Sequence, residues 1–211
     1  NGTMYYTYVP NISVVTSEQF GGNLYINNSS VLSHDLTVVG NVHAYYGLDL
    51  KGFSLNTGNY STYYGTTKIS GGNLSVTGSL IIDYYAHLNM TNAEDYVCVS
   101  GAFTMSSRYS HSSLLTAGTL EVRGDFTQNS NNATNFLASG EHKTVLSGKA
   151  GTANRNYVQI VKFNSPGQSK FNHLVLNKAL SNYSFTPAID QLCNDYVNEA
   201  KDDQAPEQVK D

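Results

Sequence analysis

The sequence has little charge, and this shortage narrows the classes of protein that it can encode. Only 13% of its 211 residues are Asp, Glu, Lys or Arg, about half of the share that soluble domains usually have. The net charge is −4 and no basic cluster occurs, which argues against nucleic-acid binding, because phosphate contacts need clustered Lys and Arg. No run of 18 apolar residues occurs, so the sequence predicts no membrane insertion.

Cysteine occurs only twice, as Cys98 and Cys193, and no CxxC pair is present. A disulfide framework uses more cysteines than this, and a zinc site uses closely spaced ligands. We expect two isolated thiols, Cys98 on a strand and Cys193 on a helix, although the spacing leaves a disulfide between them open. The six histidines show no HxH or HxxxH spacing, and no GxSxG motif occurs. The sequence therefore predicts no metal, no cofactor and no catalytic residue.

Asn, Ser, Thr, Gly and Tyr take the place of charge, and among them a run of the form apolar-x-apolar-x-Gly recurs. Thr and Tyr favour strands, whereas Gly and Asn favour turns. The final residues of successive copies are 24, 26, 23, 23 and 24 residues apart, and a fixed period in this range is typical of repeat architectures. The copies lie at residues 24–28, where Asn replaces Gly, and at 48–52, 74–78, 97–101, 120–124 and 144–148.

Alternation places the apolar side chains of each run on one face, and the glycine lets the chain turn a corner. Coils stacked about 4.8 Å apart then share one continuous core. The sequence predicts an all-β fold, a single-stranded parallel β-solenoid in the form of a right-handed β-helix, with about 24 residues per rung. A second apolar series indicates two strands per turn, with a short third strand as an option. We expect Leu74, Val97 and Leu120 to stack directly; a β-sandwich is the competing interpretation.

The predicted solenoid occupies residues 1–185, and a short C-terminal α-helix over 186–201 caps its open end. Thr186 and Pro187 make a favourable helix start. Residues 202–211 are polar and acidic, which predicts a flexible tail. The alternative is that the helix belongs to a following domain, and we expect the chain to be a monomeric module of a larger protein. The apolar stripe of the helix consists of Ile189, Leu192, Cys193, Tyr196 and Val197.

Tyrosine is the residue type that points to binding. The sequence has 16 Tyr and no Trp, and several tyrosines are adjacent. Neighbours on a strand point to opposite faces, so we expect one ring of each pair to be exposed. Exposed tyrosine is enriched at binding surfaces and also stacks on sugar rings; in the competing interpretation the rings only cover the edges of the coils. The candidate binding residues are Tyr45, Tyr46, Tyr63, Tyr64, Tyr84 and Tyr85.

Two other features have scaffold interpretations. Arg123-Gly124-Asp125 spells the integrin-binding tripeptide, but Gly124 is the corner glycine of a repeat copy. Polysaccharide-cleaving enzymes often use parallel β-helices, and Asp49 and Glu121 share a register in the repeat. Three coils would separate these two carboxylates by about 14 Å, which is too far for a glycosidase pair. The sequence therefore predicts a protein that is not an enzyme.

The segments LEVRGDFTQ (120–128), NFLASGEHKTVLSG (135–148) and VKFNSPGQSKFNHLVLN (161–177) resemble repeat segments in large surface proteins of Gram-positive gut and soil bacteria. The similarity covers residues 115–178, and it carries over no functional residue. It implies a secreted or cell-wall-associated, β-helical stalk or adhesin region. Some gut-commensal surface proteins of this kind bind immunoglobulin variable domains as B-cell superantigens, so the resemblance implies an immunoglobulin as one candidate ligand.

We therefore expect an extracellular adhesion module that binds a host protein, such as an immunoglobulin, or a glycan through a tyrosine-rich flank. A structural spacer of a cell-surface protein is the first alternative. A carbohydrate-binding or carbohydrate-active β-helix is the second.

Overall fold

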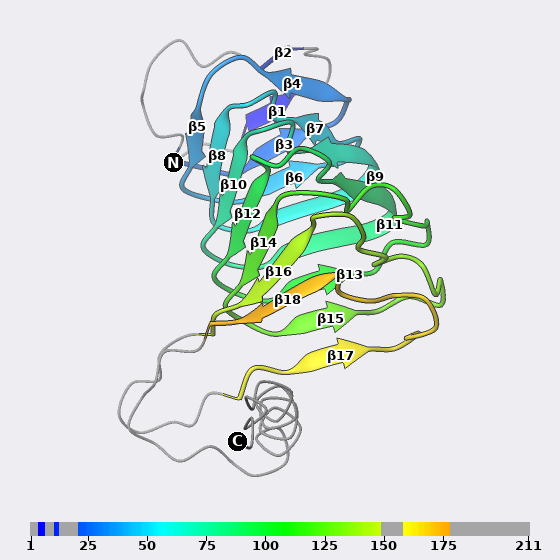
Figure 1. Cartoon of the computed structure of the whole chain (residues 1–211). Coiled ribbons are helices and arrows are strands. Elements are labelled where there is room, and N and C mark those ends of the chain that lie inside the picture. The colour runs from blue at the N-terminus through cyan, green and yellow to red at the C-terminus, as the bar shows by residue number, and fades with distance from the viewer. Residues whose placement is uncertain (1–3, 7–10, 13–20, 149–157, 178–211) are drawn as a thin grey trace, which may run out of the picture. The chain divides into compact units, whose positions relative to one another are not determined.

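The computed structural model describes residues 4–6, 11–12, 21–148 and 158–177, all of which belong to the unit Asn1–Ala179. In these residues the regular elements are β-strands without an α-helix, and every strand pair is parallel (Figure 1). The predicted all-β class is thus confirmed for the described part. The predicted capping helix at 186–201 and tail at 202–211 lie outside the described residues.

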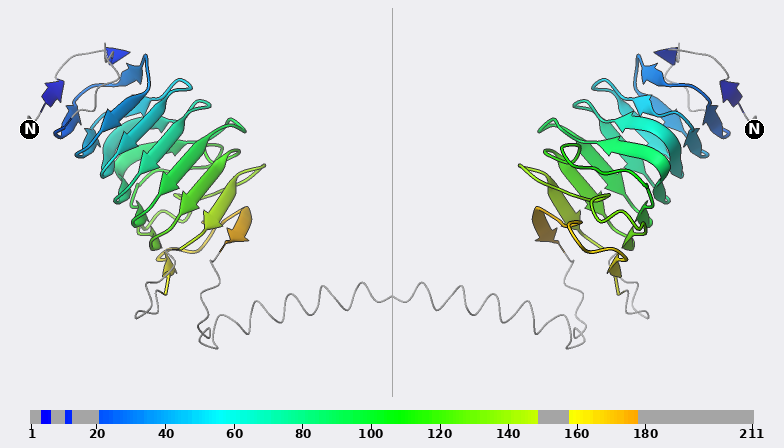
Figure 2. Two further views of the ribbon diagram at one scale, coloured as in Figure 1. Left: turned by 90° about the vertical axis from the view of Figure 1, so that its left-hand side faces the viewer. Right: turned by 90° about the vertical axis from the view of Figure 1, so that its right-hand side faces the viewer.

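One sheet has seven strands, which follow one another in chain order from blue to orange in Figure 2. Its strands are β5 (Leu36–Val38), β8 (Ser54–Thr57), β10 (Asn73–Val76), β12 (Tyr96–Val99), β14 (Thr119–Val122), β16 (Lys143–Leu146) and β18 (His173–Leu176).

The other sheet has eleven strands. Its main path is β1 (Met4–Tyr6), β3 (Leu24–Ile26), β6 (Val42–Ala44), β9 (Tyr60–Lys68), β11 (Leu80–Asn89), β13 (Phe103–Met105), β15 (Phe126–Gln128) and β17 (Val161–Phe163). A side branch of β2 (Asn11–Ile12), β4 (Ser30–Leu32) and β7 (Leu48–Asp49) joins it at β9.

From β3 onward the chain passes from the eleven-stranded sheet to the seven-stranded sheet and back, once per turn. Equivalent strands of successive turns therefore pair with each other, although they lie far apart in the sequence. Leu74 pairs with Val97, and Val97 pairs with Leu120, in direct register. The predicted stacking of these three residues is therefore confirmed.

The constant repeat of about 24 residues is wrong for the first turns. Leu24 and Leu48 belong to β3 and β7 of the eleven-stranded sheet, not to the series that contains Leu74. The error has a simple cause, because every side of a coil has the same alternation of buried and outward residues. Residues in register across the seven-stranded sheet are 19, 19, 23, 23, 24 and 30 positions apart: Leu36, Leu55, Leu74, Val97, Leu120, Thr144 and Leu174.

Glycines form a corner at the passage from the seven-stranded to the eleven-stranded sheet. The amide of Gly78 donates to the carbonyl of Gly58 at 2.6 Å, and the amide of Gly101 donates to Gly78 at 2.8 Å. A Cβ at Gly101 would lie 2.5 Å from the carbonyl oxygen of Gly78, so a side chain there would force the coils apart. The amide of Gly124 donates to the carbonyl of Gly101 in the same way, so Gly124 is a corner glycine, as predicted. Gly52, predicted to be equivalent, lies elsewhere, near Ser70.

The core lies between the two sheets. Leu74 and Val97 face it from the seven-stranded sheet, and Leu80 faces it from the eleven-stranded sheet, all with no exposed surface. Phe103 and Phe126 stack with their ring centroids 5.2 Å apart on neighbouring strands. Each turn thus adds its apolar side chains to one continuous interior, which agrees with the physical basis of the prediction.

Candidate functional site

The six tyrosines predicted as the binding site come together across neighbouring strands of the eleven-stranded sheet. Tyr45 and Tyr46 follow β6, Tyr63 and Tyr64 lie within β9, and the third pair lies within β11. Because β6, β9 and β11 are adjacent and parallel, equivalent positions lie one above another. We call this group, together with Tyr109 after β13, the tyrosine strip; it consists of Tyr45, Tyr46, Tyr63, Tyr64, Tyr84, Tyr85 and Tyr109.

The rings of the tyrosine strip contact one another from turn to turn. Tyr45 stacks on Tyr63 with the centroids 5.3 Å apart, and Tyr46 stacks on Tyr64 at 5.7 Å. Tyr64 lies 6.2 Å from Tyr85 in a tilted arrangement. Contacts of this kind add about 0.5–1.5 kcal/mol per pair beyond the area that they bury. The strip is thus an ordered surface rather than a set of separate side chains.

The backbone at Tyr84 and Tyr85 departs from regular strand geometry. Tyr84 has a φ of 51°, in the left-handed region, and its amide donates to the carboxylate of Asp83 at 2.7 Å. The pairing of β11 with β9 shifts register between Ile82 and Tyr85. This bulge turns both tyrosines of the pair outward, and they are 43% and 38% exposed. The expectation of one exposed ring per pair is wrong here, because it assumed a regular strand. It is also wrong for Tyr45 and Tyr46, which lie after the end of β6 and are 37% and 51% exposed.

Glycine allows the two earlier pairs to approach each other. Gly65 follows Tyr64 with a φ of 72°, and a Cβ there would lie 2.1 Å from the carbonyl oxygen of Tyr46. The amide of Tyr64 donates to the carbonyl of Tyr45 at 2.7 Å. Tyr46 is the most exposed ring of the strip at 51%, whereas Tyr63 is half-buried.

Three residues that the sequence analysis missed extend the strip. Tyr109 lies 5.0 Å from Tyr85, measured between ring centroids, and His87 stacks on Tyr109 at 5.3 Å. The guanidinium of Arg108 lies 5.0 Å above the ring of Tyr84, within the range of a cation–π contact. Burial lowers the pKa of His87, which favours the neutral imidazole in this stack.

The stacking determines which parts of the tyrosine rings a ligand can reach. In the first two turns each tyrosine covers one face of its stacked partner, so a ligand cannot reach that face of either ring. Such a surface combines apolar contact with hydrogen bonding. Its side chains are already ordered by their neighbours, so less conformational entropy remains to be lost when a ligand binds.

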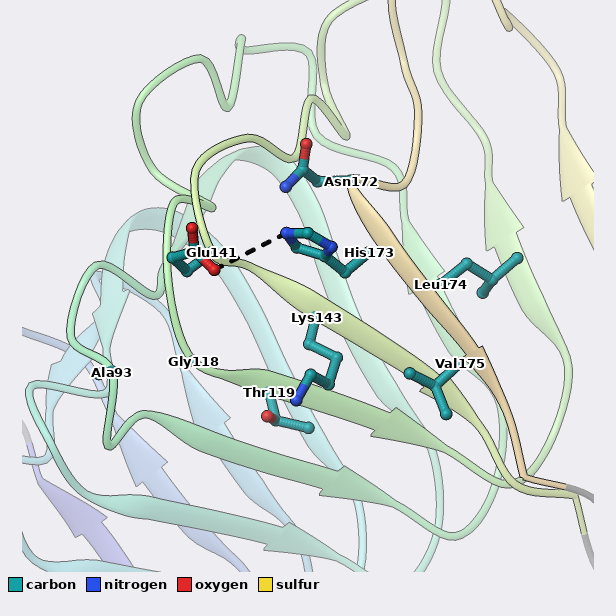
Figure 3. A pocket seen from close by; sticks show the side chains of 9 residues that line it. All are labelled: Ala93, Gly118, Thr119, Glu141, Lys143, Asn172, His173, Leu174 and Val175. Carbon is teal, nitrogen blue, oxygen red and sulfur yellow. Dashed lines mark ion pairs between the residues drawn. The ribbon is translucent and has the colours of Figure 1, made fainter. Parts of the chain in front are cut away.

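A second surface feature is a shallow depression beside the last strands of the seven-stranded sheet (Figure 3). Its volume is about 560 Å³. His173 Nε2 lies 3.8 Å from Glu141 Oε2, and Lys143 extends from the neighbouring strand. Both side chains of the His173–Glu141 pair are more than half exposed, so solvent screens this contact. The lining residues are Ala93, Gly118, Thr119, Glu141, Lys143, Asn172, His173, Leu174 and Val175.

Glu121 is the centre of a polar network on the outer face of the seven-stranded sheet. It accepts hydrogen bonds from Tyr96 Oη at 2.5 Å, Arg123 Nε at 2.8 Å and Ser147 Oγ at 2.9 Å. Partial burial opposes its ionisation, but the hydrogen bonds outweigh that effect and lower the pKa of Glu121. Asp49 belongs to the other sheet, so the predicted common register of Asp49 and Glu121 is wrong.

The Arg123-Gly124-Asp125 tripeptide is tied into the scaffold. Arg123 pairs with Glu121, and Asp125 Oδ1 accepts a hydrogen bond from the backbone amide of Ile160 at 2.8 Å.

Cys98 lies on β12, as predicted, and burial is the largest cause of the raised pKa of its thiol. Among the described residues, no group of three or more His, Cys, Asp or Glu side chains is placed to hold a metal ion.

The fold and the site define an all-β protein of parallel sheets with an exposed, ordered strip of tyrosines. No family model, no curated protein and no solved structure matches the chain. Within the described ranges, no helix has the length and apolar character needed to cross a bilayer.

Proposed function

We propose that the described part of the chain is a β-solenoid, and that it is a non-enzymatic, extracellular binding module. The parallel pairing of strands from successive turns, with direct register at Leu74, Val97 and Leu120, supports the solenoid. Connections between parallel strands of one sheet are right-handed in almost all proteins, which supports the right-handed form that the sequence analysis expected. The tyrosine strip is the proposed binding surface.

The observation that carries this proposal is the combination of order and exposure in the strip. Tyr46, Tyr64 and Tyr85 are between 38% and 51% exposed, and yet each contacts a ring from a neighbouring turn. The core does not need these rings, because the interior between the sheets is filled by aliphatic, methionine and phenylalanine side chains and by Tyr60. Rigid tyrosines with low entropy cost are the typical contact residues of protein-binding surfaces.

A protein ligand fits the strip better than a glycan in the first turns. Sugar rings stack on the faces of aromatic side chains, and Tyr63 and Tyr64 cover one face each of Tyr45 and Tyr46. The strip repeats with the spacing of stacked strands, about 4.8 Å, which is also the strand spacing of a partner β-sheet. Immunoglobulin variable domains consist of β-sheets with this strand spacing. The resemblance to commensal surface proteins also implies an immunoglobulin as the ligand.

Binding to immunoglobulin Fab fragments tests the proposal, with host serum proteins and a glycan array as further probes. Tyr64→Ala removes the ring that contacts both neighbouring turns, and truncation of a central interface tyrosine typically costs about 2 kcal/mol or more. We expect affinity to fall about 30-fold. Val39→Ala, which truncates a 58%-exposed side chain between β5 and β6, should leave affinity unchanged. Equal affinities of the Tyr64 variant and the wild type would overturn the proposal.

A structural spacer is the second candidate. Within the described ranges β18 pairs with β16 alone, and its Leu174 and Leu176 are 46% and 49% exposed. A further coil could pair with this edge without any change to the sheet. If the protein binds neither serum proteins nor glycans, and the parent gene contains tandem copies of this unit, the spacer is favoured.

An enzyme is less well supported, because the aspartates that the structure describes act as hydrogen-bond acceptors for the backbone. Asp35 accepts the amide of Ser54 at 2.7 Å, and Asp95 accepts the amide of Gly71 at 2.6 Å. These contacts fix turns between successive coils. Carboxylates used in this way are not paired for acid–base catalysis.

A further inference from the structure

The geometry points to a site of oxidative modification in the tyrosine strip: Tyr45 with Tyr63, Tyr46 with Tyr64, and Tyr85 with Tyr109 couple to dityrosine and join neighbouring turns covalently. The ring centroids of these pairs are 5.3, 5.7 and 5.0 Å apart. At least one ring of each pair is solvent-exposed. The inference concerns the chemistry of the strip and does not depend on which ligand it binds.

The coupling needs a one-electron oxidant, and a haem peroxidase with hydrogen peroxide is the class that we name. Each of two phenols loses one electron and one proton and becomes a phenoxyl radical. The radicals form a carbon–carbon bond between ring positions next to the oxygens, and the two ring hydrogens at that bond return to the oxygens as the rings regain aromaticity. One hydrogen peroxide takes up the two electrons and two protons and gives two waters, so each cross-link removes two hydrogen atoms from the protein.

Proximity is what favours these pairs over others. A phenoxyl radical on Tyr46 has the ring of Tyr64 as its nearest neighbour, held there by the backbone of adjacent strands, so coupling within the molecule has a high effective concentration. Tyr84 is disfavoured, because it lies 6.0 Å from both Tyr64 and Tyr85, farther than the rings of any proposed pair. Tyr60 is fully buried and its hydroxyl is bonded to Thr67 at 2.8 Å, so the peroxidase does not reach it.

The consequence of coupling is a set of covalent links along the axis of stacking. Each solenoid turn contacts mainly the turns beside it, so a link between two turns opposes their separation. Cross-links act in part by restricting the unfolded chain. Coupled protein should therefore unfold at a higher denaturant concentration than untreated protein.

The sequence makes the test direct, because trypsin cleaves after Lys51, Lys68 and Arg108 and so separates the partners of each pair. Dilute protein is treated with a haem peroxidase and hydrogen peroxide, and dityrosine is followed by its fluorescence and by mass spectrometry of tryptic peptides. We expect peptide 1–51 joined to 52–68, and 69–108 joined to 109–123, with the loss of two hydrogens for each link and in monomeric protein.

Variants separate the proposed pairs from general oxidation. Tyr109→Phe keeps an aromatic ring but removes the phenol, so it should abolish the link between 69–108 and 109–123 and leave the other intact. The double variant of Tyr63→Phe and Tyr64→Phe should have the opposite effect. Cross-links only between molecules, or the same peptide pairs with equal yield in urea-unfolded protein, would overturn the inference. Ligand binding by the untreated strip is measured separately, so either idea can fail alone.

Discussion

Acid should destabilise the protein through a histidine that the fold buries without a partner. The side chain of His142 has no exposed surface, packs edge-on against Phe136 with the centroids 6.2 Å apart, and neither of its ring nitrogens has a hydrogen-bond partner among the described residues. Burial lowers the pKa of His142 from 6.5 to about 4. The native state therefore stays neutral in a range where the unfolded chain takes up a proton.

The sign and size of the effect follow from linkage between protonation and folding. Because the folded pKa lies below the unfolded one, stability is complete above pH 6.5 and falls as the pH drops toward about 4. The shift corresponds to about 3 kcal/mol at 1.36 kcal/mol per pKa unit. Urea unfolding at a series of pH values measures this loss. Burial lowers the pKa of His111 to about 3 in the same way, so the wild type combines both contributions.

A variant isolates the contribution of His142. His142→Leu keeps an apolar side chain of similar size and removes the titrating ring, so its free energy of unfolding should fall by about 3 kcal/mol less than that of the wild type over the same pH range. Val39→Ala, which truncates an exposed side chain without a titratable group, should leave the pH dependence as it is. If the His142 variant and the wild type lose the same stability in acid, the reasoning from burial is refuted.

Two further variants test the packing by urea unfolding at neutral pH. Gly101→Ala should cost at least about 2 kcal/mol, since the new Cβ would lie 2.5 Å from the Gly78 carbonyl oxygen. Gly52→Ala makes only an ordinary contact, 3.9 Å from the Ser70 carbonyl oxygen, and should cost only about 1 kcal/mol for its positive φ; equal costs would contradict the corner geometry. Tyr60→Phe should cost about 1–3 kcal/mol, because the buried hydroxyl of Thr67 loses its partner; an unchanged midpoint would show that this hydrogen bond contributes no net stability.

The later turns were predictable because their lengths are nearly equal. Leu74, Val97 and Leu120 are 23 residues apart and in register, and the glycines of their runs form a real corner. The first turns are shorter, and the run at Leu48 lies on a different side of the coil. A better signal for these turns is the Gly-Asn pair at 22–23, 40–41 and 58–59. Its asparagines bond from turn to turn, as in the Asn59 amide to Asn41 Oδ1 contact at 3.0 Å.

The tyrosine doublets were predictable as a group, but their arrangement was not. Tyr84 and Tyr85 are both exposed because of a bulge, and a bulge has no clear signal in an alternating pattern. Tyr109 and Arg108 were missed because they are not part of a doublet, although Tyr109 follows Tyr85 by 24 positions, close to the length of the later turns. Contacts between turns depend on three-dimensional register, which composition does not encode.

Direct stacking of equivalent residues from turn to turn aligns the tyrosine strip, and cross-linking across neighbouring strands tests it most directly. Ser75 on β10 pairs in register with Cys98 on β12, and Asn56 on β8 lies one strand further away. In a Cys193→Ser background, Ser75→Cys should form a disulfide with Cys98 within the monomer on mild oxidation, since adjacent strands meet the distance requirement. Asn56→Cys should not, because two strand spacings are about 9.6 Å. A disulfide from position 56, or none from position 75, would contradict the stacking.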